Sequence, residues 1–167
     1  MLEANIRLAT ERDDGHLLKA VTDEQDYERA LHDTRRPGVE IAESYLAHIR
    51  AKIAHNQGAL LVAELNAVFA GYAACWMEHD GNIAETDDSN HFGYVADTYV
   101  VPEFRGRGVV SRLLETAVSH MRALSISRMR IWTLANNTSA KRAYEAYGFL
   151  LDEDLFFGDA AVETLGR

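Results

Sequence analysis

The stretch that most constrains the fold runs from Phe92 to Phe149, where a strand, a glycine-rich turn, an amphipathic helix, a second strand and a second helix follow one another. Residues 94–101 are rich in β-branched and aromatic side chains, and Pro102, which cannot donate to a β-ladder, ends the run. Apolar residues at helical spacing begin at Val109. The stretch therefore predicts a βαβα unit with its glycines at the first strand-to-helix turn.

The turn itself predicts an anion site. The first amides of a helix lack helical acceptors and lie at the positive end of the macrodipole, so a negative group is favoured there. Gly106 and Gly108 have no Cβ, which lets a phosphate approach the backbone closely. Three arginines add positive charge at the same end of the helix: Arg105, Arg107 and Arg112.

Other interpretations of the turn compete with this one. A P-loop of the form Gly-x-x-x-x-Gly-Lys-Ser/Thr would need a lysine after Gly108, and none follows. A dinucleotide-binding turn would need a third glycine, but Ser111 stands in its place. The remaining alternative is a tight turn whose arginines are simply solvated. A second motif further along the chain favours the phosphate interpretation.

The residues from Val101 to Val110 resemble the acyl-CoA pyrophosphate loop of the GNAT superfamily of N-acyltransferases, whose signature is Gln/Arg-x-x-Gly-x-Gly/Ala after a strand. Arg105 and Gly108 match this signature, whereas Val110 replaces its last small residue and is expected to narrow or reshape the contact with the cofactor. Residues 137–149 are similar to the second signature of the family, Asn-x-x-Ala-x-x-x-Tyr-x-x-x-Gly-Phe. Two signatures in order are far more specific than one glycine turn.

The resemblance implies an α/β (mixed α+β) fold, with residues 1–167 as a single GNAT-type N-acetyltransferase domain. Its central sheet is expected to be mixed, mostly antiparallel and of about six to seven strands, flanked by about four helices. The strand that carries Asp97 and the strand that carries Ile131 should form a splayed parallel pair that admits the pantetheine arm between them.

The resemblance also implies an activity, that of an acetyl-CoA-dependent N-acetyltransferase, an acyltransferase that transfers groups other than amino-acyl groups. A primary amine would attack directly within a ternary complex, with acetyl-CoA as co-substrate and no metal. The expected cofactor-binding residues are Tyr99, Val100, Val101, Arg105, Gly106, Arg107, Gly108, Val109, Val110, Ser111, Asn137 and Tyr144. The alternative is a non-catalytic acyl-CoA-binding or regulatory module that keeps the phosphate loop.

Two side chains are predicted to be catalytic. By resemblance, Tyr144 would donate a proton to the departing sulfur, although it could instead only pack its helix on the sheet. Asp97 is the first choice for the general base, with a structural hydrogen bond or a substrate-charge contact as its alternative roles. Three other side chains could flank the acceptor opening and serve as the base: Glu78, His79 and His91.

Charge and composition limit the partners. The net charge of −9 argues against nucleic acid, whose binders carry basic surfaces, and an acidic surface could attract a cationic amine. The acceptor stays open between a small-molecule amine (polyamine, aminoglycoside or amino acid) and a protein amine (N-terminus or lysine side chain). Cys75 is the single cysteine, in an apolar run that favours a buried, inert thiol over a nucleophile. No signal peptide or membrane span is recognised, so a cytoplasmic protein is expected, and family analogy suggests a homodimer.

The rest of the chain supplies further elements. A polar loop over residues 79–91 mixes His and carboxylates without a recognisable metal-ligand spacing, so a solvated loop is expected. Gly71 marks a candidate bulge within a hairpin. Early acidic side chains such as Glu40 and Glu43 could face substrate, but surface solvation is favoured. Strands are predicted at residues 5–10, 59–64, 68–77, 129–134, 149–150 and 155–157, and helices at residues 17–31 and 39–55 and after a cap at residues 136–138.

Overall fold

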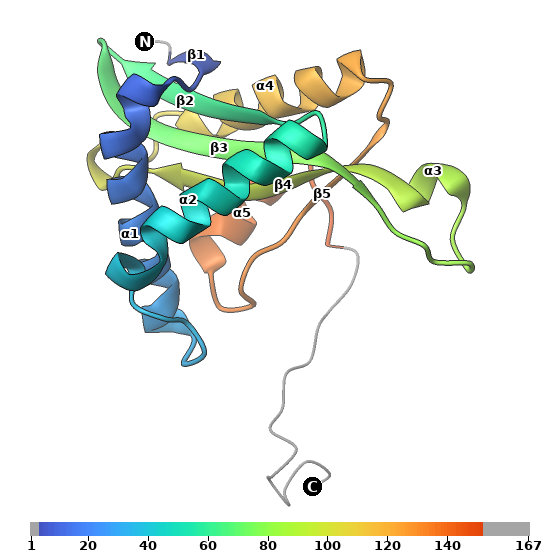
Figure 1. Ribbon diagram of the computed structural model, residues 1–167, viewed down its shortest axis with the longest axis horizontal. Coiled ribbons are helices and arrows are strands. Elements are labelled where there is room, and N and C mark those ends of the chain that lie inside the picture. Colours follow the sequence, from blue (N-terminus) through green and yellow to red (C-terminus); the bar gives the residue numbers. More distant parts are fainter. Residues whose placement is uncertain (1–3, 152–167) are drawn as a thin grey trace, which may run out of the picture.

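A mixed β-sheet with helices on both faces forms the protein, as the computed structural model shows for the residues it describes, 4–151 (Figure 1). The strands in this part of the chain are β1 (Asn5–Leu8), β2 (Ala59–Leu65), β3 (Val68–His79), β4 (His91–Val100) and β5 (Arg128–Ile131). They lie in the sheet in chain order, antiparallel except for the parallel β4–β5 pair. The parallel pair follows because a helix connects the two strands.

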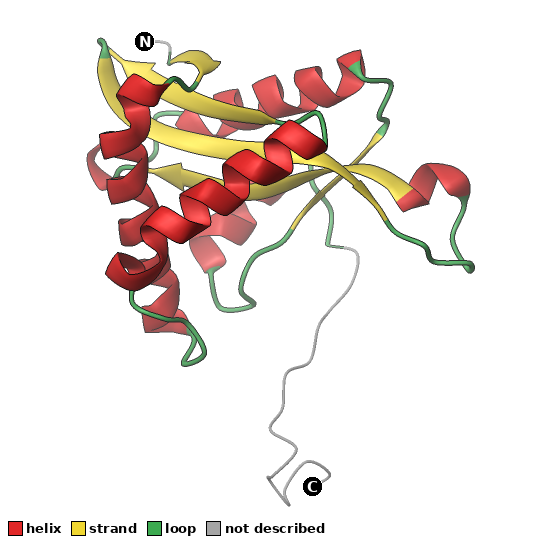
Figure 2. Ribbon diagram, in the orientation of Figure 1, coloured by secondary structure: helices red, strands yellow, loops and turns green. Residues whose placement is uncertain are grey.

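The long helices occupy two layers. The described α-helices are α1 (Asp14–Leu31), α2 (Gly38–His55), α3 (Asp87–Asn90), α4 (Val109–Ala123) and α5 (Thr138–Tyr147), and short 3₁₀ turns precede α1 (Glu11–Asp13) and follow β4 (Pro102–Phe104). The long α1 and α2 lie together on one face of the sheet, and α4 lies on the other (Figure 2). Each helical layer covers its own apolar cluster, so the sheet is buried on both faces.

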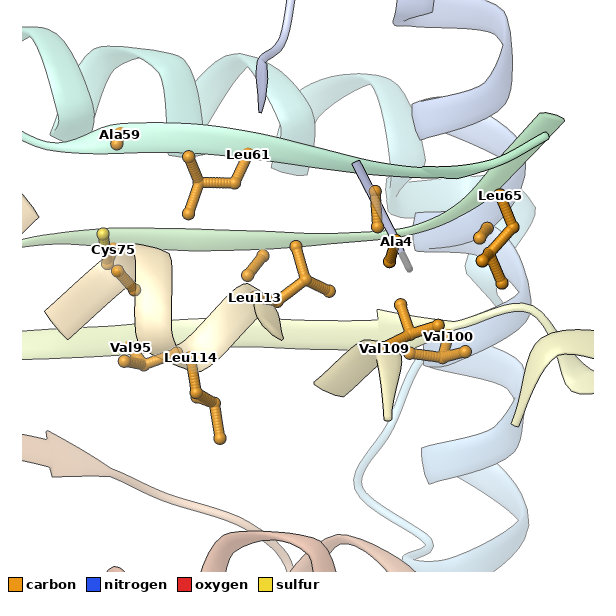
Figure 3. Packing of buried hydrophobic residues seen from close by; sticks show 14 of the residues in the cluster. Ala4, Ala59, Leu61, Leu65, Cys75, Val95, Val100, Val109, Leu113 and Leu114 are labelled. Carbon is orange, nitrogen blue, oxygen red and sulfur yellow. The ribbon is translucent and has the colours of Figure 1, made fainter. Parts of the chain in front are cut away.

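The α4 layer shows how the sequence pattern builds this packing. Val109, Leu113, Leu114, Ala117 and Met121 recur at helical spacing and all are buried. They meet alternate side chains of the central strands in one apolar cluster (Figure 3). The opposite face of α4 is polar, so the helix has one way to sit on the sheet.

The strands β4 and β5 part midway along β4, at one edge of the described sheet. Their pairing ends at Val95 and Ile131, whereas β4 continues to Val100. Along the β3 side, Val95 pairs with Cys75 and Asp97 pairs with Ala74, so Ala96 is an extra residue in a β-bulge. A bulge bends its strand and increases its twist, which turns the end of β4 away from β5.

Most elements predicted from the sequence are confirmed. The expected strand at residues 5–10, the two early helices, the hairpin and the splayed parallel pair are all present. The two early helices are separated by residues 32–37, with Pro37 as the N-cap of α2. The α/β (mixed α+β) fold, mostly antiparallel, is therefore confirmed, although the described part of the sheet has five strands rather than six to seven.

Four local predictions need correction. The strand expected over residues 129–134 ends at Ile131, because the chain leaves β4 there. The polar loop contains the short helix α3, and residues 149–150 are not a strand. The bulge near Gly71 falls on Ala70; Gly71 is needed because a Cβ there would lie 2.3 Å from the Tyr99 carbonyl oxygen. The strand predicted at residues 155–157 lies outside the described residues.

Candidate functional site

A cavity of about 360 Å³ opens where β4 and β5 part. Its walls come from α1, the second half of β4, the glycine turn, the first turn of α4 and the helix α5. Ten of the twelve residues predicted to bind cofactor line it: Tyr99, Val100, Arg105, Gly106, Gly108, Val109, Val110, Ser111, Asn137 and Tyr144. The lining omits Val101 and Arg107. Residues chosen from two separate motifs thus meet around one space.

The glycine turn forms one end of the cavity. Gly106 and Gly108 have φ values of 72° and 77°, in the left-handed region that favours glycine, and Gly108 is the N-cap of α4. A Cβ on either glycine would meet no atom within 4 Å, so the backbone is open to an approaching group. The first amides of α4 have no helical acceptors. The turn can therefore accept an anion on its backbone.

The arginines of the turn each interact with a neighbouring group of the protein. The Arg105 Nε donates to the Val100 carbonyl oxygen at 2.9 Å, and its guanidinium lies over the rings of Tyr27 and Tyr99. Arg105 therefore ties the turn to the end of β4 while it lines the cavity. Arg107 lies over the ring of Phe104 at 5.6 Å. Arg112 forms an ion pair with Glu115. Anion binding would rest mainly on backbone amides.

Val110, which departs from the family signature, lies in the first turn of α4. Its side chain is half-buried, packs against the apolar cluster beneath α4 and lines the cavity. The cavity is therefore open with valine at this position, and the branched side chain forms part of its wall.

The helix α5 closes the opposite wall. Asn137 is its N-cap, as predicted, and its side-chain oxygen accepts from the Ala140 amide at 3.2 Å, while Gly148 ends the helix with a φ of 119°. Tyr144 projects from this helix, half-buried and beside Thr98. Burial, and then the charge of Glu24, raise the pKa of the Tyr144 phenol above its ordinary value of 10.0. Tyr144 thus remains a protonated hydrogen-bond donor at neutral pH.

Asp97 lies at the bulge of β4 and combines burial with one strong hydrogen bond. The Tyr45 hydroxyl donates to Asp97 Oδ1 at 2.9 Å. The other oxygen, Oδ2, is buried and has no hydrogen-bond partner among the described residues. Burial raises the pKa of Asp97 to about 7, although the Tyr45 hydrogen bond acts in the opposite direction. A carboxyl group with this pKa can accept a proton near neutral pH.

Two further acids of the site, Glu24 and Glu28, escaped the sequence analysis. The Tyr72 hydroxyl donates to Glu24, and burial followed by the charge of Asp97 raises the pKa of Glu24 well above 4.5. Glu28 lines the cavity and pairs with Arg35 at 3.1 Å. A signal was present: Leu17, Val21, Glu24 and Glu28 follow one helical face, so the acids continue an apolar stripe.

Other candidates lie away from the cavity. Glu78 pairs with Lys52 at 3.0 Å, and the rings of His79 and His91 contact each other at 4.3 Å; none of these three proposed bases lines the cavity. Cys75 is fully buried under α4, and burial raises its pKa to about 11, which fits the predicted inert thiol.

The early acidic side chains that could face substrate lie outside the cavity. Glu40 pairs with Arg36, and neither it nor Glu43 lines the cavity. Within residues 4–151, no three His, Cys, Asp or Glu side chains gather in a way that could hold a metal ion. None of the helices in this range is both long enough and apolar enough to cross a bilayer.

Comparison with known proteins identifies the family of the chain. The family model described as acetyltransferase (GNAT) family matches residues 20–149. An uncharacterised N-acetyltransferase of Archaeoglobus fulgidus is 26% identical over 92 residues, which are 55% of this chain and 60% of that protein. The matched part of the chain thus spans less than two thirds of this relative.

Two solved structures have similar folds. A predicted acetyltransferase from Clostridium acetobutylicum, solved with acetyl-CoA, has a TM-score of 0.70 at 19% identity, over 94% of this chain and 96% of that one. The aminoglycoside N-acetyltransferase AAC(6')-Iy, in complex with the bisubstrate analogue CoA-S-monomethyl-acetylneamine, has a TM-score of 0.70 at 20% identity, over 94% and 97% of the two chains. At these identities the likeness concerns the fold.

Proposed function

Since the chain belongs to the acetyltransferase (GNAT) family, we propose that it transfers the acetyl group of acetyl-CoA to a primary amine by direct attack in a ternary complex. One observation carries the proposal: a single cavity joins an anion-accepting glycine turn to a carboxyl group of raised pKa and a protonated phenol. This arrangement suits a ligand with a phosphate end and a reactive end. A small-molecule amine is the proposed acceptor.

The cofactor fits the residues present. The open backbone at Gly106 and Gly108 would take the pyrophosphate, with the first amides of α4 as donors. The backbone from Tyr99 to Val101, at the end of β4 and beyond its pairing with β5, would receive the pantetheine arm in the gap beside β5. Acetyl-CoA would supply a thioester carbonyl that accepts the amine and a thiol that leaves.

Asp97 would act as the general base. The attacking amine must lose a proton as its nitrogen forms the new bond, and a carboxylate of pKa about 7 can take that proton, directly or through a water. Tyr45 holds Asp97 Oδ1, which leaves Oδ2 for the acceptor. Asp97 faces the α1 and α2 layer, because its partner Ala74 packs there. The acceptor would therefore approach from that layer.

Tyr144 would act on the leaving sulfur. It comes from the α4 and α5 side of the sheet, where Thr98 also points, since neighbouring side chains of a strand alternate between faces. Acid and base would thus work from opposite sides of the gap. Because the pKa of Tyr144 is raised, complete proton transfer to a thiolate is uphill, so its contribution is a hydrogen bond that strengthens as negative charge develops on sulfur.

The rival function, an acyl-CoA-binding module without catalysis, would not need the hydroxyl of Tyr144. Calorimetric titration with acetyl-CoA, with desulfo-CoA and free nucleotide as controls, tests the cofactor, and CoA release in the presence of amines tests transfer. We expect Tyr144→Phe to lower kcat by about 100-fold while the acetyl-CoA affinity stays within about twofold. The matched control is Tyr147→Phe, which changes a half-buried tyrosine of α5 outside the cavity lining.

Each outcome separates the two functions. Saturable binding that needs the pantetheine arm, with CoA release that depends on Tyr144, supports the enzyme. Binding without release for any amine supports the binding module. Equal losses of acetyl-CoA affinity and kcat in Tyr144→Phe would contradict the proposed role of Tyr144 toward the leaving sulfur.

A further inference from the structure

The charges that line the cavity are unevenly distributed. Three acids line it, Glu24, Glu28 and Asp97, and among the described lining residues Arg105 alone is basic. Arg105 is engaged with the end of β4, as its hydrogen bond to the Val100 carbonyl oxygen shows. The acids gather where α1 faces the bulge of β4. The cavity therefore has an anion-accepting end and an acidic end.

Two of the three acids lack a positive partner. Glu28 pairs with Arg35 at 3.1 Å, whereas no basic side chain within residues 4–151 pairs with Glu24 or Asp97. Each accepts a hydrogen bond from a tyrosine hydroxyl instead, Glu24 from Tyr72 and Asp97 from Tyr45. Buried carboxylates are normally paired or neutralised. Two adjacent acids without a cation point to a cation that comes from outside.

The cavity also contains buried polar atoms that await a partner. Asp97 Oδ2 and Thr98 Oγ1 are each exposed by less than 1 Å² and have no hydrogen-bond partner among the described residues. Both belong to the residues that line the cavity. Unsatisfied buried polar groups are rare in folded proteins, and a ligand is one explanation for them. Asp97 Oδ2 lies with the acids on the α1 and α2 side of the gap, whereas Thr98 Oγ1 lies on the α4 and α5 side, beside Tyr144. The orphaned Oδ2 is therefore the buried polar atom at the acidic end of the cavity.

An aromatic wall accompanies these groups. Trp132 lines the cavity with 70% of its surface exposed, and its ring contacts Tyr94 at 5.4 Å between centroids. An exposed indole in the same cavity as the acids suits the alkyl part and the positive end of an alkyl ammonium ion.

We propose that the acceptor is an amine with a second positive charge, a diamine or polyamine, whose distal ammonium pairs with Glu24 while Asp97 serves the reacting nitrogen. The inference rests on the proposed function. A monoamine would bring one positive charge to two unpaired carboxylates and leave Glu24 without a cation. A distal carboxylate, as in an amino acid, would be repelled by both acids. Glu24 would thus determine specificity rather than take part in bond formation.

Support comes from the titration of Glu24. Burial and the charge of Asp97 raise its pKa well above the ordinary 4.5, with Glu28 as a further negative neighbour. The titratable groups that face it from other elements are Asp97 and Tyr99 of β4, Tyr72 of β3, Tyr45 of α2 and Tyr144 of α5, none of which is basic. A distal ammonium would reverse this effect and favour the charged carboxylate.

The test compares three amines with the same carbon chain and different distal groups: butylamine, diaminobutane and aminobutyrate. We expect kcat/KM with acetyl-CoA for diaminobutane to exceed that for butylamine by about tenfold, with aminobutyrate lowest. In Glu24→Gln, the amide oxygen can still accept a hydrogen bond from Tyr72, but the ratio of kcat/KM for diaminobutane to kcat/KM for butylamine should fall to about one. The matched control is Glu43→Gln, which removes the same charge from an exposed position outside the lining and should keep the tenfold ratio.

A binding measurement separates this inference from the proposed function. Calorimetric titration of the protein–CoA complex with each amine should give a higher affinity for diaminobutane than for butylamine, and Glu24→Gln should abolish this difference in affinity. Equal affinities and equal kcat/KM values for the two amines would overturn the inference. A preference for aminobutyrate, or a diaminobutane-to-butylamine ratio that is unchanged in Glu24→Gln, would overturn it as well. If butylamine is acetylated well and diaminobutane poorly, the acetyltransferase stands and the inference falls. If no amine is acetylated, the proposed function falls, and the binding ranks still decide whether the site takes a dication.

Discussion

The hydrogen bond between Tyr45 and Asp97 offers a direct test of the proposed base. Tyr45 donates to Asp97 Oδ1 at 2.9 Å, and this bond stabilises the charged carboxylate against the burial that raises its pKa to about 7. Tyr45→Phe removes the donor and keeps the ring in the apolar layer beneath α1 and α2. The charged form of Asp97 then loses stabilisation, so its pKa must rise.

The size of the shift follows from the energy of such a bond. A hydrogen bond to a charged group contributes about 1.5–3 kcal/mol, and one pKa unit corresponds to about 1.4 kcal/mol, which gives a rise of about one to two units. Because Asp97 is half-buried and its environment can adjust, the lower end is expected, a pKa of about 8. The ionised fraction at pH 7 would fall from about one half to about one tenth, so kcat/KM should drop about fivefold there and little above about pH 9.

The assay is the pH profile of kcat/KM, measured by CoA release from about pH 6 to about pH 10. The ratio of variant to unmodified protein at each pH cancels the ionisation of the amine, which is common to both. Asp97→Asn is the control, since it cannot ionise and should lose the acid limb that Asp97 produces. A ratio that is constant across the pH range, or a midpoint that moves downward, would refute the assignment of Asp97 as the titrating base.

Two other features of the fold give predictions of a different kind. Gly108→Ala places a Cβ at a φ of 77° and should reduce the free energy of unfolding by about 1–2 kcal/mol and weaken acetyl-CoA binding. Denaturant unfolding and calorimetry would measure these two effects. The control is Gly15→Ala, in helix α1 and without positive φ, which should raise the free energy of unfolding by about 0.5–1 kcal/mol instead. Arg7 holds the pKa of Asp13 well below 3.8 through an ion pair of 2.8 Å, so the stabilisation is present above pH 3.8 and lost as the pH falls below it. Thermal unfolding against pH should show this loss, which Asp13→Asn would remove; the same acid dependence in the variant would contradict the reasoning.

Local chemistry explains why much of the site was predictable. The two left-handed glycines of the turn, the cap at Asn137 and the αL ending at Gly148 depend on residues within a few positions of each other. The apolar stripe of α4 is likewise a property of spacing. The list of twelve cofactor residues came from the family resemblance, and ten of them line the cavity.

The acidic half of the site could not be derived in the same way. Tyr45 and Asp97 are 52 residues apart and meet only because α2 crosses the face of the sheet that β4 presents. Glu24 reaches the same space from α1, and its raised pKa results from burial and from the charge of Asp97. The end of β5 at Ile131, and with it the gap, depends on the bulge at Ala96 in the neighbouring strand.

The sequence by itself determined the glycine turn, the caps, the helical and strand periods and hence the order of the elements, since each is decided by neighbouring residues. Tertiary structure decided which charges share the cavity, how far their pKa values move and which of several acids could serve as base. The physical reason is that burial and charge interactions act through space, between side chains whose separation along the chain carries no information about their distance.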